Sequence, residues 1–179
     1  TKPPCFAHVY SPPEGADGAG NTFWFGLEPT ITEEEDEIRD SIVERLLRDA
    51  PQKERFDNDA EFIAMIHEMM DEMTTTTTSS LLSNPVVNQA RELIGMGEAP
   101  IKVTPEQLDR LKYVVVRDLV NNGPLETLLA DEMLEDIHSI GLSRINMDHK
   151  VFPMLTSNIA FKDQELLTKY LRSMSERIG

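Results

Sequence analysis

The sequence predicts an α+β protein: a small N-terminal domain made of a hairpin and helices, then a second α+β domain whose helices pack on a small, mostly antiparallel sheet. Residues 6–10 and 22–27 alternate in hydropathy, as half-buried strands do. Between residues 32 and 119, apolar side chains recur at helical spacing. Residues 145–155 return to alternation before a last helical stretch.

The first element is a predicted β-hairpin. Its connection, SPPEGADGAGN, is rich in proline and glycine and is expected to be a loop. One face should carry the aromatic rings, with Trp24 or its neighbours on that face depending on the register. The rings form either a small core, which is favoured, or a binding platform. The side chains concerned are Phe6, His8, Tyr10, Phe23, Phe25 and Leu27.

A capping box predicts the first helix. Thr32 can accept from the backbone of Glu35, whose carboxylate reaches back. The acidic run 33–37 lies in the first turn, where the helix dipole favours negative charge. A metal or a basic partner could use these acids, but a capped, solvated helix start explains them. The residues expected to be buried are Ile38, Ile42, Val43, Leu46 and Leu47.

A second helix is predicted to begin near Asp57 or Asn58. Its apolar stripe is rich in methionine, which suits both cores and adaptable binding grooves, and core packing is favoured. His67-Glu68 lacks the second histidine that a zinc-protease helix requires. The stripe consists of Phe62, Ile63, Met65, Ile66, Met69, Met70 and Met73.

The tract TTTTTSS at 74–80 is interpreted as a domain boundary, because β-branched threonines disfavour helix and bury little. We therefore expect an acidic docking domain over 1–73, a linker over 74–84 and a second α+β domain over 85–179. Pro85 should open a helix within that second domain.

The second domain continues with another capping box, Thr104 to Gln107, and a helix that ends at Asn122-Gly123. Pro124 can open a short helix with Leu125, Leu128 and Leu129 on one apolar face. Strands are expected around Ile145 and Met147, and around Phe152 and Leu155. Asp163 should cap a final helix. Its inward residues are expected to be Leu166, Leu167, Tyr170, Leu171 and Met174.

The charge is strongly negative and uneven. The chain has a net charge of −15; residues 1–73 hold 18 acidic and 6 basic side chains, and the remainder hold 14 and 11. A field of this sign disfavours direct binding to nucleic acid or anionic lipid. A basic protein partner for the first half fits better.

Cysteine usage and hydropathy limit the chain further. Cys5 is the single cysteine, which excludes an intrachain disulfide and a cysteine-based zinc site. No apolar run approaches the ~20 residues of a membrane span. The first residues contain no apolar core of a signal peptide, and Thr1 is not a natural initiator, so a processed or trimmed fragment is expected.

No catalytic, cofactor-binding or metal-ligating residue is assigned. The acids Asp131, Glu132, Glu135 and Asp136 suggest a Mg²⁺ site, but no phosphate loop accompanies them. Structural roles are favoured: Asp131 should end the short helix and Asp136 should satisfy a turn. His138 and His149 without a third ligand are more typical of surface or core histidines. The chain has no Gly-x-x-x-x-Gly-Lys-Ser/Thr motif.

An ordered set of motifs resembles one family. The string Gly123-Pro-Leu-x-x-Leu-Leu-x-Asp131 is followed by Leu134-Glu-Asp-Ile137 and Gly141, and is preceded by Tyr113-x-x-x-Arg117-Asp118. His149, Thr156-Ser-Asn158 and Phe161 continue the pattern. It resembles the region before the motor in the hexameric ATPases of type II and type IV secretion, type IV pili and the archaellum. Pro3-Pro4-x-Phe6-Ala7-x-Val9, Phe23-x-Phe25-x-x-Glu28-Pro29 and Thr32 resemble the start of the archaeal members.

The resemblance implies a non-catalytic N-terminal region of a cytoplasmic, hexameric ATPase that assembles pili, archaella or secretion filaments. ATP and magnesium would bind only in the motor, which would lie beyond Gly179. Neighbouring subunits and a membrane platform or accessory protein would be its partners, which places it at the inner face of the cell membrane. The alternative from the residues alone is a free-standing acidic adaptor. A weaker third hypothesis is a metal-dependent hydrolase that uses the acids from Asp131 to Asp136.

Overall fold

The computed structural model describes residues 5–50, 56–76 and 98–178. The chain divides into two compact units: Thr1–Pro29 with Arg117–Gly179, called here the sheet unit, and Thr30–Val116, called the helical unit. Both contain helices and strands, so the predicted α+β class is confirmed. The division differs from the sequence-based boundary at the threonine tract, because the N-terminal hairpin joins a sheet formed by residues that lie more than a hundred positions later.

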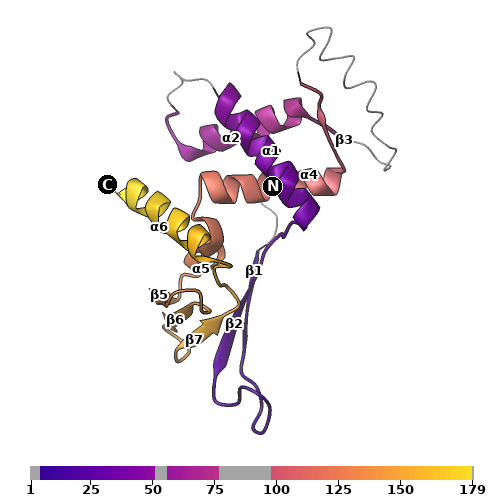
Figure 1. The fold of residues 1–179 in the computed structure, drawn as a ribbon. Helices are drawn as coiled ribbons and strands as arrows, with labels where there is room; N and C mark the ends of the chain where they lie inside the picture. The colour runs from indigo at the N-terminus through magenta and orange to yellow at the C-terminus, as the bar shows by residue number, and fades with distance from the viewer. Residues whose placement is uncertain (1–4, 51–55, 77–97, 179) are drawn as a thin grey trace. The chain divides into compact units, whose positions relative to one another are not determined.

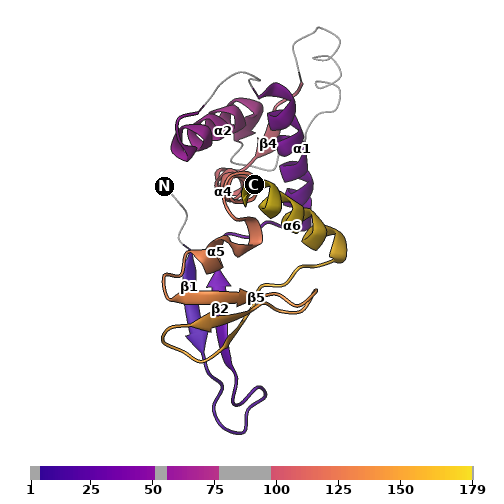
Figure 2. The ribbon, with the colours of Figure 1, turned by 90° about the vertical axis from the view of Figure 1, so that its left-hand side faces the viewer.

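The sheet unit is built on five strands in the order β1-β2-β7-β6-β5 (Figures 1 and 2). The β2–β7 pair is parallel and the other pairs are antiparallel. The predicted hairpin is confirmed with the boundaries that the sequence suggested. The strands are β1 (Phe6–Tyr10), β2 (Thr22–Leu27), β5 (Leu134–His138), β6 (Asn146–His149) and β7 (Leu155–Ser157).

One face of this sheet forms the core of the unit. Trp24 is fully buried, and Val9 lies opposite it on β1. Because side chains alternate along a strand, Phe23 and Phe25 lie on the other face with the rest of the aromatic set. The expectation that this set forms a small core is therefore wrong for Phe6 and Tyr10, which are exposed. Leu128 of α5 (Glu126–Leu129) and Leu167 of α6 (Gln164–Ile178) cover the core face.

Gly26 occupies a position where a side chain does not fit. A Cβ atom there would lie 2.6 Å from the Trp24 ring and 3.2 Å from Cγ2 of Thr127. The indole therefore lies over a strand position that has to be glycine. Asn158 holds the same residue from the side, because its Oδ1 accepts from the Gly26 N–H at 2.8 Å and its Nδ2 donates to the Gly26 carbonyl at 3.0 Å.

The glycine turn after α4 (Pro105–Leu119) is confirmed. Gly123 has a φ of +53°, a backbone conformation that glycine tolerates best. It starts the 3₁₀ turn η1 (Gly123–Leu125), which leads directly into α5. The turn is held by α6, since the Tyr170 hydroxyl donates to the Asn122 carbonyl at 3.1 Å.

The helical unit packs α1 (Glu33–Asp49), α2 (Asp59–Met73) and most of α4 with a two-stranded parallel sheet of β3 (Thr74–Thr76) and β4 (Ile101–Val103). The expected linker therefore begins with a strand. Predicted linker residues 77–84 and the helix expected after Pro85 lie outside the described residues. Buried side chains include Ile42, Leu46, Ile66, Met70, Val103, Leu108, Leu111, Val114 and Val115.

Both predicted capping boxes form. Thr32 and Glu35 exchange hydrogen bonds at the start of α1, and Thr104 and Gln107 do so at the start of α4. Glu35 also pairs with Arg110 although its side chain is almost fully buried. Burial by itself raises the pKa of Glu35, but hydrogen bonds from Arg110 and Thr32 and the charge of Arg110 outweigh it, so the pKa is lowered from 4.5.

This lowered pKa predicts acid sensitivity. A carboxyl whose pKa falls on folding stabilises the protein above its unfolded pKa and loses that contribution as the pH falls through the folded pKa. The melting-temperature difference between wild type and Glu35→Gln should therefore shrink from about pH 7 to about pH 3. Glu34→Gln, at an exposed position of the same turn, is the control and should change little. A difference that is constant with pH would contradict the role of Glu35.

Several predictions about individual side chains were wrong. Leu47 on α1, Leu129 on α5 and the α6 residues Leu166 and Leu171 are exposed rather than buried. Each lies at the edge of the apolar stripe of its helix. A residue there is buried only where the surface that the helix packs against is wide enough to cover it. Phe152 lies in a bend between β6 and β7 and not in a strand.

Candidate functional site

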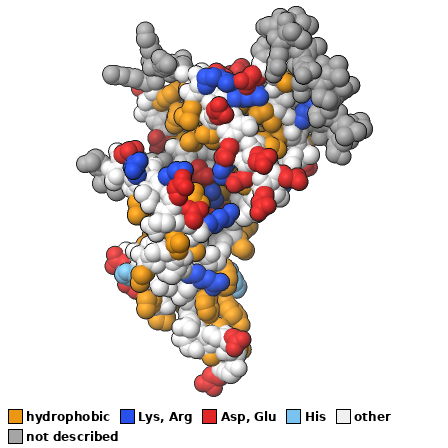
Figure 3. Space-filling view, viewed as in Figure 1, with side chains coloured by type: hydrophobic (Ala, Val, Ile, Leu, Met, Phe, Trp, Pro, Cys, Tyr) orange, Lys and Arg blue, Asp and Glu red, His pale blue; other side chains and the backbone are white. Residues whose placement is uncertain are grey.

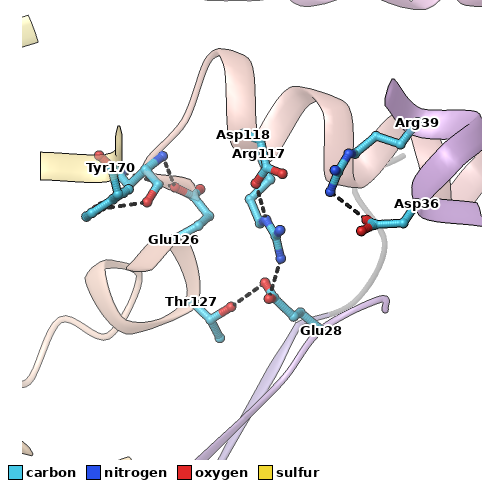
Figure 4. Close-up of polar contacts among 9 residues, drawn as sticks. Glu28, Asp36, Arg39, Arg117, Asp118, Glu126, Thr127 and Tyr170 are labelled. Carbon is cyan, nitrogen blue, oxygen red and sulfur yellow. Dashed lines mark hydrogen bonds and ion pairs between the residues drawn. The ribbon is translucent and has the colours of Figure 1, made fainter. Parts of the chain in front are cut away.

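Residues from distant parts of the resembling motifs meet in the sheet unit around Glu28, just after β2. Its Oε1 accepts from Arg117 Nη1 at 2.6 Å and its Oε2 accepts from the Thr127 hydroxyl at 2.9 Å (Figure 4). Arg117 Nε also donates to Asp118 at 2.8 Å. Glu28, Arg117, Asp118 and Thr127 are called here the Glu28 network. It fastens the end of the hairpin to α4 and α5.

The geometry of this network suits a structural role, in which paired charges hold the end of β2 in place. The side chains of Arg117 and Glu28 are 16% and 19% exposed, and each faces an opposite charge. A partly buried ion pair that also receives a hydroxyl hydrogen bond is well compensated. The Arg117 guanidinium has two carboxylates within hydrogen-bond distance, so its positive charge is compensated by Glu28 and Asp118.

A second cluster in the sheet unit forms around Asp131, the last residue of the motif that begins at Gly123. Trp24 Nε1 donates to Asp131 Oδ2 at 3.2 Å, and the Met133 N–H donates to Oδ1 at 3.0 Å. His149 Nε2 lies 3.7 Å from the same Oδ2. Asp131 thus links strands β2 and β6 to the end of α5, and the expectation that it ends the short helix is consistent with this placement.

The environment of His149 fixes its neutral tautomer. Nδ1 accepts from the backbone N–H groups of Val151 and Phe152 at 3.1 and 3.3 Å. An acceptor at Nδ1 requires the hydrogen of a neutral imidazole to be on Nε2, which faces Asp131. With 5% of its side chain exposed, His149 is a core histidine that holds the β6–β7 bend.

The two histidines do not form a metal pair. Met147 faces the core and alternation puts His149 on that side, whereas His138 bonds Asp148 at 3.0 Å on the opposite face. Asp136 lies within β5 opposite Asp148 and satisfies no turn, which corrects its predicted role. Among the described residues, no three His, Cys, Asp or Glu side chains are placed to share a metal ion.

The acidic run on α1 lies on the surface of the helical unit. Glu33, Glu34 and Glu37 are exposed, while Glu35 of the same run points inward to Arg110. Asp40 and Glu44 continue the exposed side farther along the helix. The helical unit as a whole has 19 acidic and 9 basic residues, a net charge of −10.

The helical unit also has an open groove of about 730 Å³, lined among others by Arg45, Arg48, Glu72 and Glu98. Glu98 bridges the two arginines at 2.7 and 2.8 Å. The hydrogen bond from Arg48 is the main cause of the lowered pKa of Glu98. Because its arginines are paired, the groove offers little net attraction to an anion.

Sequence reasoning missed the contacts that make these clusters. Glu28, Arg117 and Asn158 belong to the motifs, but nothing local in the sequence indicates that they meet. The bonds join residues 89 positions apart for Glu28–Arg117 and 132 for Gly26–Asn158. The available signal was that Glu28 and Arg117 are motif residues of opposite charge, but the sequence does not indicate that they pair.

The chain is similar to two proteins of Methanocaldococcus jannaschii, both described as uncharacterized. It is 31% identical to MJ0900 over 179 residues, which is 98% of this chain and 30% of that protein. It is 30% identical to MJ1288 over 82 residues, 44% of this chain and 32% of that protein. The chain therefore spans about a third of the length of the curated relatives it matches. No protein-family model matches it.

Among the described helices, none combines the length and the hydropathy that a bilayer span requires.

Proposed function

We propose that this chain is the non-catalytic N-terminal region of a hexameric secretion or pilus-assembly ATPase. The observation that supports this most is that the resembling motifs from both ends of the chain converge. Glu28 of the first set contacts Arg117 of the second. Thr127 and Trp24, which lie within the two sets at positions that the motifs leave open, add the contacts Thr127–Glu28 and Trp24–Asp131. Separate motifs that build one unit are better explained by a shared architecture than by independent chance matches.

In this proposal the motor, with its ATP and magnesium, belongs to the rest of a longer protein. The similarity to MJ0900 over almost the whole chain, but under a third of that protein, is compatible with such an arrangement. The sheet unit would contact the motor of a neighbouring subunit and move with the nucleotide cycle. The hydrogen bonds and ion pairs of the Glu28 network and the Asp131 cluster join the elements of this unit, which makes it suited to move as a rigid body.

The helical unit supplies the docking surface. The exposed acids of α1 gather on one side, where Figure 3 shows them in red, and a basic surface would complement them. The proposed partner is a basic protein face on a membrane platform or accessory protein at the inner side of the cell membrane. Lipid headgroups are a poor partner, because anionic membranes repel a unit with a net charge of −10.

A second candidate is a free-standing acidic adaptor that binds a partner without ATP chemistry. The exposed acids of α1 favour it equally, since docking by charge requires no motor. The two candidates differ in what accompanies this chain in the native protein.

The mass of the native protein in the cells that make it separates the candidates. The motor proposal predicts an intact mass far above the 20.3 kDa of this chain, with peptides that carry Gly-Lys-Ser or Gly-Lys-Thr. A native protein of about this chain's own mass, without such a peptide, would overturn the motor proposal and leave the adaptor.

A further inference from the structure

The two edges of the five-stranded sheet differ in how they are protected. β5, at one edge, contains a bulge between Leu134 and Asp136 and carries the charges of Glu135 and Asp136. Bulges and charges are the usual means of blocking strand addition. β1, at the other edge, has the sequence FAHVY, an unbroken register with β2, and no Asp, Glu, Lys, Arg or Pro residue.

The hydrogen-bond directions in β2 show which groups β1 presents at its outer edge. The backbone groups of Trp24 and Gly26 point toward β7, where they bond Asn158. In an antiparallel pair the bonding residues alternate, so Phe23, Phe25 and Leu27 bond β1 through Tyr10, His8 and Phe6. The N–H and C=O groups of Ala7 and Val9 therefore point outward from the sheet.

This edge is complementary to itself. In an antiparallel pairing with a two-fold axis at His8, Ala7 of one copy lies opposite Val9 of the other. The outward groups of both residues then exchange N–H···O=C bonds, and none of them lacks a partner. A pairing shifted by one residue would place outward groups against inward ones and lose these bonds.

The same register also matches the exposed rings. Phe6 is 60% exposed and Tyr10 is 46% exposed, on the face opposite the core. Pairing about His8 sets Phe6 of one copy opposite Tyr10 of the other, in the narrow, non-hydrogen-bonded type of pair. Aromatic cross-strand pairs contribute about 0.2–1 kcal/mol each relative to alanine pairs. The backbone thus limits pairing to registers that set outward groups against outward groups, and the exposed rings favour the register about His8 among them.

We propose that β1 is a homotypic docking edge, through which two copies of this chain pair antiparallel about His8 and continue the sheet. This contact is separate from the charge-based docking of α1 and does not depend on the proposed ATPase. Because each copy has a net charge of −15, repulsion opposes pairing at low salt. Dimerisation should therefore strengthen with salt, whereas docking through α1 should weaken.

Disulfide trapping tests the register directly. In a Cys5→Ser background, His8→Cys places two thiols across a pair whose Cα atoms are about 4.5 Å apart, within disulfide range. Ala7→Cys is the matched control, because its two copies would be about 8 Å apart, beyond the roughly 7 Å limit. Mild oxidation should convert most of H8C to a covalent dimer and leave A7C monomeric. Equal yields, or none for H8C, would contradict the register.

Sedimentation velocity of the unmodified chain tests pairing itself. A dimer should appear with rising concentration and with salt. Ala7→Pro removes an outward N–H without touching the β1–β2 bonds and should abolish the dimer, while Ala7→Val keeps the N–H and should preserve it. Circular dichroism confirms that both variants fold. A monomer under every condition, open-ended aggregates, or dimers of A7P would overturn the proposal. If the chain is always monomeric, a strand from another protein becomes the candidate partner of this edge.

Discussion

Replacing Trp24 with alanine is expected to lower the free energy of unfolding of the sheet unit by about 3–5 kcal/mol. The indole is fully buried, packs with Met147 and Leu155 across the sheet, and lies over Gly26. Its removal leaves a cavity that a sheet fastened by the Glu28 network cannot easily close. It also leaves Asp131 without the indole donor.

The measurement is urea unfolding followed by far-ultraviolet circular dichroism, since Trp24 is the single tryptophan and its fluorescence disappears in the variant. Trp24→Phe is the control: it retains most of the ring volume and loses the hydrogen bond, so we expect a loss of about 1–2 kcal/mol. A loss below about 1 kcal/mol for alanine would mean that the sheet core is not centred on this residue.

The local features of the fold could be predicted because each depends on neighbouring residues. The capping pair of Thr32 and Glu35 needs only three residues of spacing, and the hairpin strands only their alternation. Gly123 was predicted from its place after a helix, and its positive φ confirms it. Asp163 caps α6 as expected, by accepting from the Leu166 N–H at 2.8 Å.

The features that could not be predicted are long-range. Nothing near the hairpin indicates that β2 pairs in parallel with β7, and this pairing decides which residues form one unit. The pairing of Thr74–Thr76 with Ile101–Val103 was missed for the same reason. A run of threonines is compatible with a linker or with a strand, and only the presence of a partner strand decides between them. The unit boundaries depend on both pairings.

The candidate site was predictable in its residues and not in its contacts. His149 was interpreted as a surface or core histidine, and its buried ring fits the second alternative. The Glu28 network had no local signal. The acids of α1 were predicted from composition and capping alone, and their surface exposure, except for Glu35, follows from the apolar stripe on the other side of the helix.

The second large effect is expected in partner binding. Glu33, Glu37 and Glu44 follow one another at helical spacing on the exposed side of α1. If each contributes about 0.5 kcal/mol to a contact with a basic surface, changing all three to glutamine costs about 1.5 kcal/mol, roughly a tenfold loss of affinity. The control, Glu14, Glu132 and Glu176 changed to glutamine, removes equal charge from exposed positions of the sheet unit.

The most direct test of docking through α1 is the binding of this chain to membrane vesicles from the cells that make it, measured from low to high salt. Trypsin-treated vesicles and liposomes of the extracted lipids are the comparison. We expect binding to untreated vesicles alone, weakened by salt and about tenfold weaker for the α1 variant than for its control. Affinity that does not change with salt, or equal binding by the two variants, would contradict the account.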